Sequence, residues 1–240
     1  MRYAVFGDIH SNLEALEVIA ADMKRQQPDR YLCVGDIVGY GANPKECIDL
    51  VRSINPTIVA GNHDWAAVNK INSDYFNFYA KEAIVWTGEL ITKDQRDWLS
   101  SLPLLVEEEK FTLAHSTIFK PELFSYIQTS YDAHLSFEMM KTQVGFVGHS
   151  HIPVTFLCQD YISFTLDNLI TLEEGEKALV NVGSIGQPRD ENPRAAYGIY
   201  DDEAGTIEVF RLDYDVGAAA KKIKEAGLPS ILADRLYIGQ

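Results

Sequence analysis

Short apolar runs alternate with helical segments in the first quarter of the chain. The apolar runs cover Tyr3 to Gly7, Tyr31 to Val34 and Thr57 to Ala60. Apolar residues at helical spacing cover Ser11 to Met23 and Asn43 to Val51. This order predicts β-α-β-α-β units with right-handed crossovers and a parallel sheet, at whose carboxyl strand ends ligands gather.

Local signals mark the start of both helices. Ser11 followed by Glu14 has the pattern of a capping box, so we expect the first helix to begin there. Asn43, Pro44 and Glu46 combine an N-cap, a proline in the first turn and a capping glutamate.

The remainder of the chain is first helical and then β-rich. From Ala66 to Ser101 the pattern is helical and rich in aromatic residues, most of which we expect in the core, with one or two able to flank a pocket and stack on a nucleobase. Helices are also expected at Tyr131 to Lys141 and Asp215 to Gly227, followed by a short docked segment from Pro229 to Gln240. The further predicted strands are Leu104 to Val106, Phe111 to Ala114, Val144 to Val147, Val154 to Cys158, Tyr161 to Leu166, Leu169 to Leu172, Ala178 to Val182, Ala195 to Tyr200 and Thr206 to Leu212. The strands after His151, from Val154 to Leu212, predict a second sheet, and therefore two packed sheets with helices outside.

Composition adds limits to this picture. A chain of 240 residues that is 46% hydrophobic can bury a large core, and we expect one domain over residues 1–240. Its 35 acidic and 21 basic side chains give a net charge of -14, which would repel a polyanion over most of the surface. Nucleic acid is thus not expected as a general partner. A small phosphate substrate remains possible if the site supplies its own positive potential.

We expect a cytoplasmic protein without a membrane partner. No secretion signal precedes the first predicted strand, and no apolar stretch approaches the length needed to cross a bilayer. The three cysteines, Cys33, Cys47 and Cys158, are odd in number and lack C-x-x-C spacing, so we expect reduced thiols in the core.

Metal-ligand side chains follow the ends of several apolar runs. The pieces are Asp8-Ile9-His10, Gly35-Asp36, Gly61-Asn62-His63-Asp64, His115 and Gly148-His149-Ser150-His151. Carboxylate, imidazole and amide donors suit borderline divalent ions, and these pieces supply too many donors for one ion. Asp8 and His10 are two apart at a strand end, so we expect them on one face, and Asp36 could bridge two ions with one oxygen to each. Each piece alone could be a surface pair, a turn or a helix cap, but five in order favour a two-metal site.

Together the five pieces resemble the calcineurin-like metallophosphoesterase family, in particular its small bacterial and archaeal phosphodiesterase-type branch. The resemblance implies a four-layer α-β-β-α sandwich with two mixed sheets and a dinuclear metal site at the strand ends. It implies Asp8, His10, Asp36 and His151 as ligands of one ion and Asp36, Asn62, His115 and His149 as ligands of the other. The two divalent ions would be manganese first, with iron, zinc, cobalt or nickel as alternatives.

Other residues are candidates for contact with the substrate. His63 lies outside both ligand sets and could donate a hydrogen bond to a phosphoryl oxygen or protonate the leaving oxygen, with Asp64 orienting its ring. After Gly35-Asp36 the chain lacks the aspartate and arginine of the protein-phosphatase branch, which argues against phosphoprotein hydrolysis. Tyr40 could contact a leaving group, although a structural turn is an equal alternative.

A loop from Asn181 to Arg194 resembles stretches in members of the family that hydrolyse phosphodiesters or nucleotides. Its Arg189 and Arg194 could bind a second phosphate in bidentate fashion, or pair with surface carboxylates instead. We therefore expect a two-metal hydrolase that cleaves a small phosphodiester or nucleotide-type substrate through a metal-bridging hydroxide. The alternatives are a phosphomonoesterase of broad specificity and a non-catalytic interaction module on the same fold.

Overall fold

The strands form two mixed sheets of six strands each in the computed structural model, which describes residues 1–240. The first sheet has the order β3 (Thr57–Ile58), β2 (Arg30–Cys33), β1 (Arg2–Phe6), β11 (Ala195–Asp201), β12 (Thr206–Leu212) and β9 (Leu169–Thr171). The second has the order β4 (Leu105–Glu107), β5 (Phe111–Ala114), β6 (Val144–Val147), β10 (Lys177–Asn181), β7 (Val154–Cys158) and β8 (Ile162–Thr165). Two mixed sheets are thus confirmed, but the expectation that the strands after His151 form a separate second sheet is wrong, because β9, β11 and β12 join the first sheet beside β1.

Parallel pairing occurs among β1, β2 and β3, where the sequence predicts crossovers, and also in the second sheet, where it was not predicted. β1, β2 and β3 run parallel, as do β5, β6 and β10, and the remaining pairs are antiparallel. The carboxyl ends of the parallel strands therefore gather at one end of each sheet, where the metal-ligand pieces follow.

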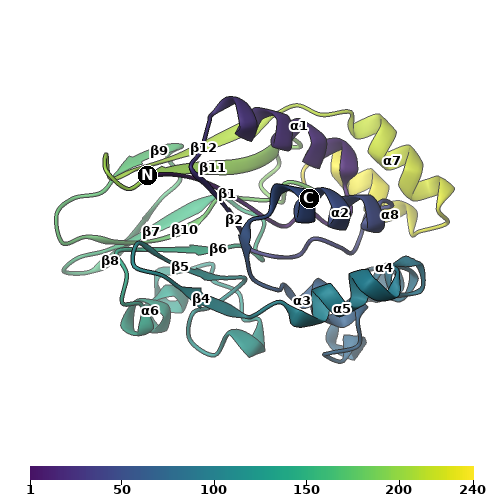
Figure 1. Ribbon diagram of the computed structural model, residues 1–240, viewed down its shortest axis with the longest axis horizontal. Helices are drawn as coiled ribbons and strands as arrows, with labels where there is room; N and C mark the ends of the chain where they lie inside the picture. Colours follow the sequence, from purple (N-terminus) through teal and green to yellow (C-terminus); the bar gives the residue numbers. More distant parts are fainter.

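Helices cover the outer face of each sheet, which gives the expected four layers (Figure 1). The helices are α1 (Leu13–Arg25), α2 (Pro44–Ile54), α3 (Asn62–Ala67), α4 (Phe78–Leu90), α5 (Lys93–Ser101), α6 (Ser130–Met139), α7 (Val216–Glu225) and α8 (Ser230–Asp234), with short 3-10 turns η1 (Ser73–Tyr75), η2 (Pro121–Leu123) and η3 (Arg235–Tyr237). Helices α1 and α2 cover the first sheet, α6 covers the second, and α3 to α5 lie together at one side.

Alternation along the strands divides the core into layers. In β1, Ala4 and Phe6 point into the cluster beneath α1 and α2, whereas Tyr3 and Val5 pack between the sheets against residues such as Phe111. Because neighbouring strand residues project to opposite faces, one short buried strand contributes to two apolar layers. This rigid double sheet is the support from which the loops of the site project.

The first helix begins one residue later than the sequence predicts. Its N-cap is Asn12, whose side chain accepts a hydrogen bond from the Ala15 backbone N–H, and the Ser11 hydroxyl has no partner. Ser11 has φ 55°, which places it inside the turn that carries Asp8 and His10 and removes it from the capping position. The expected capping box at Ser11 and Glu14 is therefore wrong.

The aromatic residues from 65 to 98 are less buried than we expected. None of them belongs to the fully buried core, and three are exposed, namely Tyr75, Phe78 and Tyr79. The helical pattern is interrupted by η1, so the aromatic stripe does not keep one face toward the sheets. Four of the seven rings, those of Trp65, Phe76, Trp86 and Trp98, are half-buried and pack against the buried clusters, so the prediction that most rings belong to the core is confirmed only in part.

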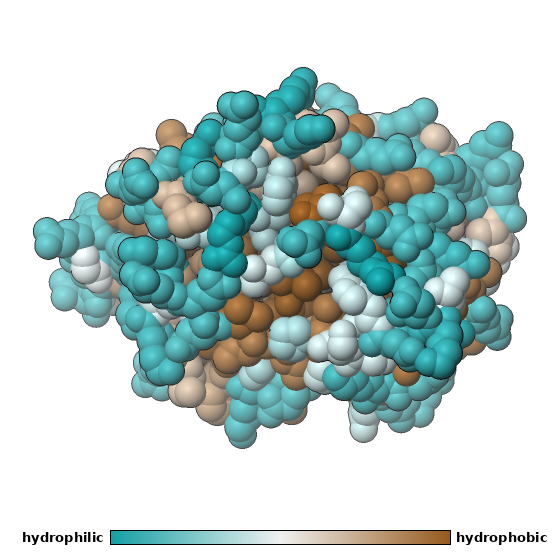
Figure 2. All heavy atoms as spheres, viewed as in Figure 1, coloured by the Kyte–Doolittle hydropathy of each residue, from teal (hydrophilic) through white to brown (hydrophobic).

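The cysteines and the surface agree with the composition. All three cysteines are free thiols, and Cys33 and Cys47 are buried. Hydrophilic side chains dominate the face in Figure 2, apart from a hydrophobic area in its middle. None of the helices combines the length and apolar character that crossing a bilayer requires.

Candidate metal centre

The five sequence pieces meet at the strand ends of both sheets. The first three follow β1, β2 and β3, and the other two follow β5 and β6. Their polar side chains form two groups whose potential ligand atoms lie within 4.8 Å of one another. One group contains Asp8, His10, Asp36 and His151, and the other contains Asp36, His115 and His149. All of these residues are buried, and Asp36 belongs to both groups.

Backbone conformation, more than strand alternation, brings these side chains together. Five of the residues have positive φ angles, which side chains larger than glycine seldom adopt. They are Asp8 at 47°, His10 at 48°, Asp36 at 51°, His149 at 70° and His151 at 62°. Asp8 and His10 do lie in one ligand group, but not because they share the face of a strand. Strand β1 ends at Phe6, and both residues belong to the loop that follows it. Such strained residues cluster at functional sites, where the surrounding structure maintains them.

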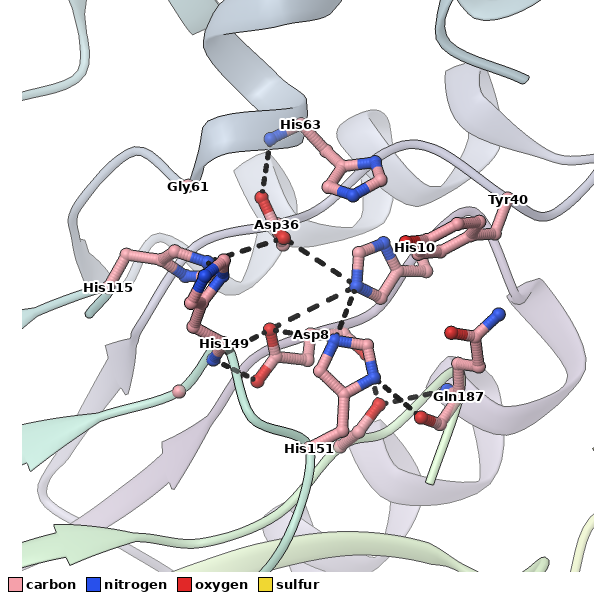
Figure 3. Close-up of polar contacts among 12 residues, drawn as sticks. Asp8, His10, Asp36, Tyr40, Gly61, His63, His115, His149, His151 and Gln187 are labelled. Carbon is pink, nitrogen blue, oxygen red and sulfur yellow. Dashed lines mark hydrogen bonds and ion pairs between the residues drawn. The ribbon is translucent and has the colours of Figure 1, made fainter. Parts of the chain in front are cut away.

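The two oxygens of Asp36 have different surroundings. Oδ1 accepts a hydrogen bond of 2.8 Å from the backbone N–H of His63, and a side chain on Gly61 would place its Cβ 2.0 Å from this oxygen. Oδ2 is buried without a hydrogen bond and lies 3.6 Å from His10 Nε2 and 3.3 Å from His115 Nε2. A single oxygen, and not one to each group as the sequence suggested, faces both groups (Figure 3).

The histidine rings are held by their other nitrogen. Nδ1 of His10, His115 and His151 lies 3.1, 2.8 and 2.6 Å from the backbone carbonyls of residues 38, 34 and 187. A carbonyl only accepts, so each Nδ1 carries the proton, and each Nε2 is then a lone-pair acceptor in the neutral ring. This second set of hydrogen bonds is the arrangement that fixes the tautomer of a metal-ligating histidine.

Two such acceptors face each other without a proton to share. His10 Nε2 lies 3.0 Å from His151 Nε2, and burial lowers the pKa of both rings well below the usual histidine range. Two neutral acceptors at this distance repel unless a cation lies between them and the nearby carboxylates. The donor set therefore fits a bound cation better than it fits an internal hydrogen-bond network.

The second group has the same character. His115 Nε2 lies 3.2 Å from His149 Nδ1 and 3.2 Å from Asn62 Oδ1, so Asn62 joins this group as an uncharged oxygen donor. Burial and the charge of His115 lower the pKa of His149 to about 3. Burial alone would lower the pKa of His115, but Asp36 raises it to about 9, so a metal ion would displace a proton from that ring.

His63 lies beside the two groups without belonging to either. Its ring is 4.8 Å from the His10 ring, and its buried Nδ1 has no hydrogen-bond partner (Figure 3). Gly39, at φ +93°, passes so close that an added Cβ would be 2.3 Å from this Nδ1. The ring therefore has a defined position and a free polar atom.

Asp64 does not orient the His63 ring as we expected. Its Oδ1 accepts hydrogen bonds from the backbone of Ile37 and Val38, and its Oδ2 accepts one from Gly61. Consecutive residues of a helix point in different directions, so Asp64 faces the neighbouring loop and not His63. Its carboxylate joins the loop of Asp36 to the first turn of α3.

A cavity of about 580 Å³ opens over the two ligand groups, and only one of the two candidate arginines lines it. Arg189 lines the cavity and donates hydrogen bonds to Gln187 Oε1 and, at 3.3 Å, to the Tyr40 hydroxyl. Tyr40 also lines it, with its ring 4.5 Å from that of His63. Arg194 is exposed, donates to Asn192 Oδ1 and is absent from the cavity wall. The structure thus does not bring the two candidate arginines together, since only Arg189 lines the cavity.

Two residues of the site were missed from the sequence. Gln187 supplies the carbonyl that holds His151 and the side-chain oxygen that holds Arg189. Tyr126 stacks on the His149 ring with centroids 4.0 Å apart. Gln187 lay in the loop already singled out, but only charged residues were considered there, and nothing in the local sequence marks Tyr126.

Fold and site together define a metal-dependent phosphoesterase. The chain belongs to the calcineurin-like phosphoesterase superfamily, whose domain profile matches residues 1–205. A metallophosphoesterase from Sphaerobacter thermophilus has a similar crystal structure, with 34% sequence identity and a TM-score of 0.88 over 100% of this chain and 99% of that one.

Two sequence relatives extend the comparison. The uncharacterized protein MJ0912 of Methanocaldococcus jannaschii is 41% identical over 244 residues, which cover 99% of this chain and 98% of that protein. A symmetrical bis(5′-nucleosyl)-tetraphosphatase of Vibrio parahaemolyticus is 27% identical over 120 residues, which cover 48% of this chain and 44% of that enzyme. The second match covers less than half of either chain.

Proposed function

We propose that this protein binds two divalent ions and hydrolyses a phosphoester bond of a small phosphodiester or nucleotide-type substrate. The observation that carries the proposal is the pair of buried ligand groups joined by Asp36 Oδ2. The complete ligand set opposes the alternative of a non-catalytic interaction module, because such a module has no need of six buried metal-ligand side chains.

The residues divide into two ligand sets in this proposal. Asp8, His10, Asp36 and His151 would hold one ion, and Asp36, Asn62, His115 and His149 would hold the other. When bound, two such ions supply Lewis acidity toward the phosphoryl oxygens and lower the pKa of water between them. Nitrogen and oxygen donors without thiolate favour manganese, with iron, zinc, cobalt and nickel as further candidates.

The remaining polar residues act on the substrate. His63 lines the cavity and would present its other ring nitrogen, Nε2, to a phosphoryl or leaving oxygen, because its Nδ1 is buried against Gly39, and the position of the ring beside His10 supports this role. Arg189 would bind an oxygen of a second phosphate group. Its guanidinium is available for this contact because it forms no ion pair with a carboxylate. Tyr40 positions Arg189 and packs against His63.

A nucleotide-type substrate is supported by two observations. The cavity is large enough for a ligand well beyond an inorganic phosphate, and the partial relative from Vibrio parahaemolyticus is named for a nucleotide substrate. We therefore place nucleotides and small phosphodiesters before simple monoesters.

Turnover of two chromogenic esters tests the proposal. The manganese-loaded protein should hydrolyse bis-p-nitrophenyl phosphate with a higher kcat/KM than p-nitrophenyl phosphate. A preference for the monoester would instead establish the phosphomonoesterase alternative. Absence of turnover of either ester by protein that holds two ions would refute a phosphoesterase of small substrates.

A further inference from the structure

The cavity over the metal centre extends beyond the residues that would hold the ions and the reacting phosphate. Two segments that are distant in sequence line this extension: residues 71–77, around η1, and residues 122–126, at and after η2. What these segments bind is not defined by the metal chemistry. The following inference rests on the proposed function and concerns the part of the substrate that lies away from the scissile bond.

Large apolar side chains are concentrated in these two segments. Tyr75 is 94% exposed, Leu123 63% and Tyr126 48%, and the half-buried rings of Phe76 and Phe124 line the same cavity. A single exposed apolar residue is ordinary on a protein surface. Five in one cavity with catalytic-type ligands mark a binding surface for an apolar or aromatic group.

The rings form an aromatic wall of the cavity that begins at the metal centre. Tyr126 stacks on His149, Phe124 lies 6.1 Å from the His115 ring, and Phe76 meets the His63 ring edge-on at 5.0 Å. Tyr75 forms no hydrogen bond and no aromatic pair through its side chain, so its ring is free to receive a ligand. A planar group attached to a phosphate at the centre would therefore lie close to aromatic rings.

Backbone strain in the second segment points the same way. Phe124 has φ 48° and Lys120 has φ 49°, so both ends of η2 are in the left-handed region. A bulky residue rarely adopts this conformation, and such strain persists mainly at ligand sites. Here it places the Phe124 ring between Trp65 and His115.

Charge excludes a further phosphate from this part of the cavity. Arg189 is the only lysine or arginine of the lining, whereas Glu122 contributes a carboxylate beside Leu123. A polyphosphate chain that continued into the aromatic part would lack cations there and would meet Glu122. An anionic group is therefore not expected between the two segments.

We propose that Tyr75, Phe76, Phe124 and Tyr126 form a nucleobase subsite for a nucleotide whose reacting phosphate lies at the metal centre. Stacking on these rings supplies affinity for any base, because each base has a π-face. Polar groups for the base edge are also at hand. Asn77 Oδ1 caps α4 by accepting from Ala80 N, which leaves the amide NH₂ free, and Glu122 can accept from an exocyclic amine.

Binding of product-type ligands to the manganese-loaded protein tests this subsite by calorimetry. At least one of the four common ribonucleoside 5′-monophosphates should bind about tenfold or more tightly than ribose 5-phosphate, which lacks the base. Tyr75→Ala should weaken that nucleotide about 5- to 30-fold and leave ribose 5-phosphate unchanged, while Tyr75→Phe should retain the preference. Tyr131→Ala is the matched control, because Tyr131 is 87% exposed on α6 and lines a different cavity.

Two results would overturn the subsite: equal binding of ribose 5-phosphate and all four nucleotides, or a preference that survives in Tyr75→Ala. Neither result bears on the metal centre. Turnover of bis-p-nitrophenyl phosphate and binding of ribose 5-phosphate report on the centre itself. If the wild-type protein neither turns over bis-p-nitrophenyl phosphate nor binds ribose 5-phosphate, the proposed function is refuted. If it does both but shows no preference for a nucleotide, only the nucleobase subsite is refuted.

Discussion

The backbone N–H of His63 donates a hydrogen bond of 2.8 Å to Oδ1 of Asp36. This contact turns the other oxygen of Asp36 toward both ligand groups, and it fixes the start of α3, from which the His63 ring projects. The residue proposed to bridge the ions and the residue proposed to contact the substrate are thus positioned by one hydrogen bond. Their roles can nevertheless be separated, because one acts through a carboxylate and the other through a ring.

Asp36→Asn should remove most of the metal from both sites and nearly all turnover. The substitution replaces the charged oxygen that faces both groups by a neutral amide, so neither ion keeps its shared ligand. Metal content by mass spectrometry and turnover of bis-p-nitrophenyl phosphate measure the effect, and circular dichroism checks the fold. Asp160→Asn, at an exposed carboxylate, is the control. Two ions per chain with full activity in Asp36→Asn would remove the bridging assignment.

His63→Ala should keep both ions and lose about 10²- to 10⁴-fold in kcat, which is the usual contribution of a positioned acid-base group. The side chain lines the cavity and belongs to neither ligand group. His134→Ala, at a histidine of α6 that is 56% exposed, should change neither quantity. A metal content reduced by half in His63→Ala would make His63 a ligand instead.

Gly39→Ala tests the position of the His63 ring without changing a polar group. The new Cβ would lie 2.3 Å from His63 Nδ1, so the ring must move, and a shift of about 1 Å can cost about 100-fold in rate. Gly175→Ala is the matched control, since it has a similar φ of +82° and no atom within 4 Å of the added Cβ. Both variants pay for a left-handed alanine, about 1 to 2 kcal/mol of folding free energy. Equal activity in the two variants would show that the position of the ring does not matter.

Arg189→Ala should raise KM for a substrate with two or more phosphates by about 5- to 150-fold, the equivalent of about 1 to 3 kcal/mol for charge-assisted hydrogen bonds. Turnover of a small aryl phosphate ester should barely change. Arg194→Ala serves as the comparison, because Arg194 is exposed and lies outside the cavity lining. Losses of equal size on both substrates would indicate that Arg189 has a structural role through Gln187 and Tyr40.

The ligand groups could be predicted from the sequence because their chemistry and order are local properties. Asp8, Asp36 and His115 each follow an apolar run that forms a strand, and parallel strands bring such positions together. The layered fold could be predicted for the same reason, since alternation in β1 assigns Tyr3 and Phe6 to opposite faces.

The details of the site depend on loop conformation, which the sequence pattern does not encode. The left-handed backbone at His10 and Ser11 decides where the helix begins, and a residue of that type gives no sequence signal. Asp64 was assigned to the wrong partner because its neighbours in space, Ile37 and Val38, belong to another loop. The aromatic wall with Tyr126 likewise arises only when two distant segments meet over one cavity.

The central claim is that two ions, joined through Asp36, are needed for phosphoester hydrolysis. Its most direct test is a titration of the chelator-treated protein with Mn²⁺, with bound metal by calorimetry and turnover of bis-p-nitrophenyl phosphate measured on the same samples. The account predicts two bound ions per chain, negligible turnover without metal, and a rise in turnover that follows occupancy of the second ion. Saturation at one ion with full activity, or undiminished activity in metal-free protein, would contradict it.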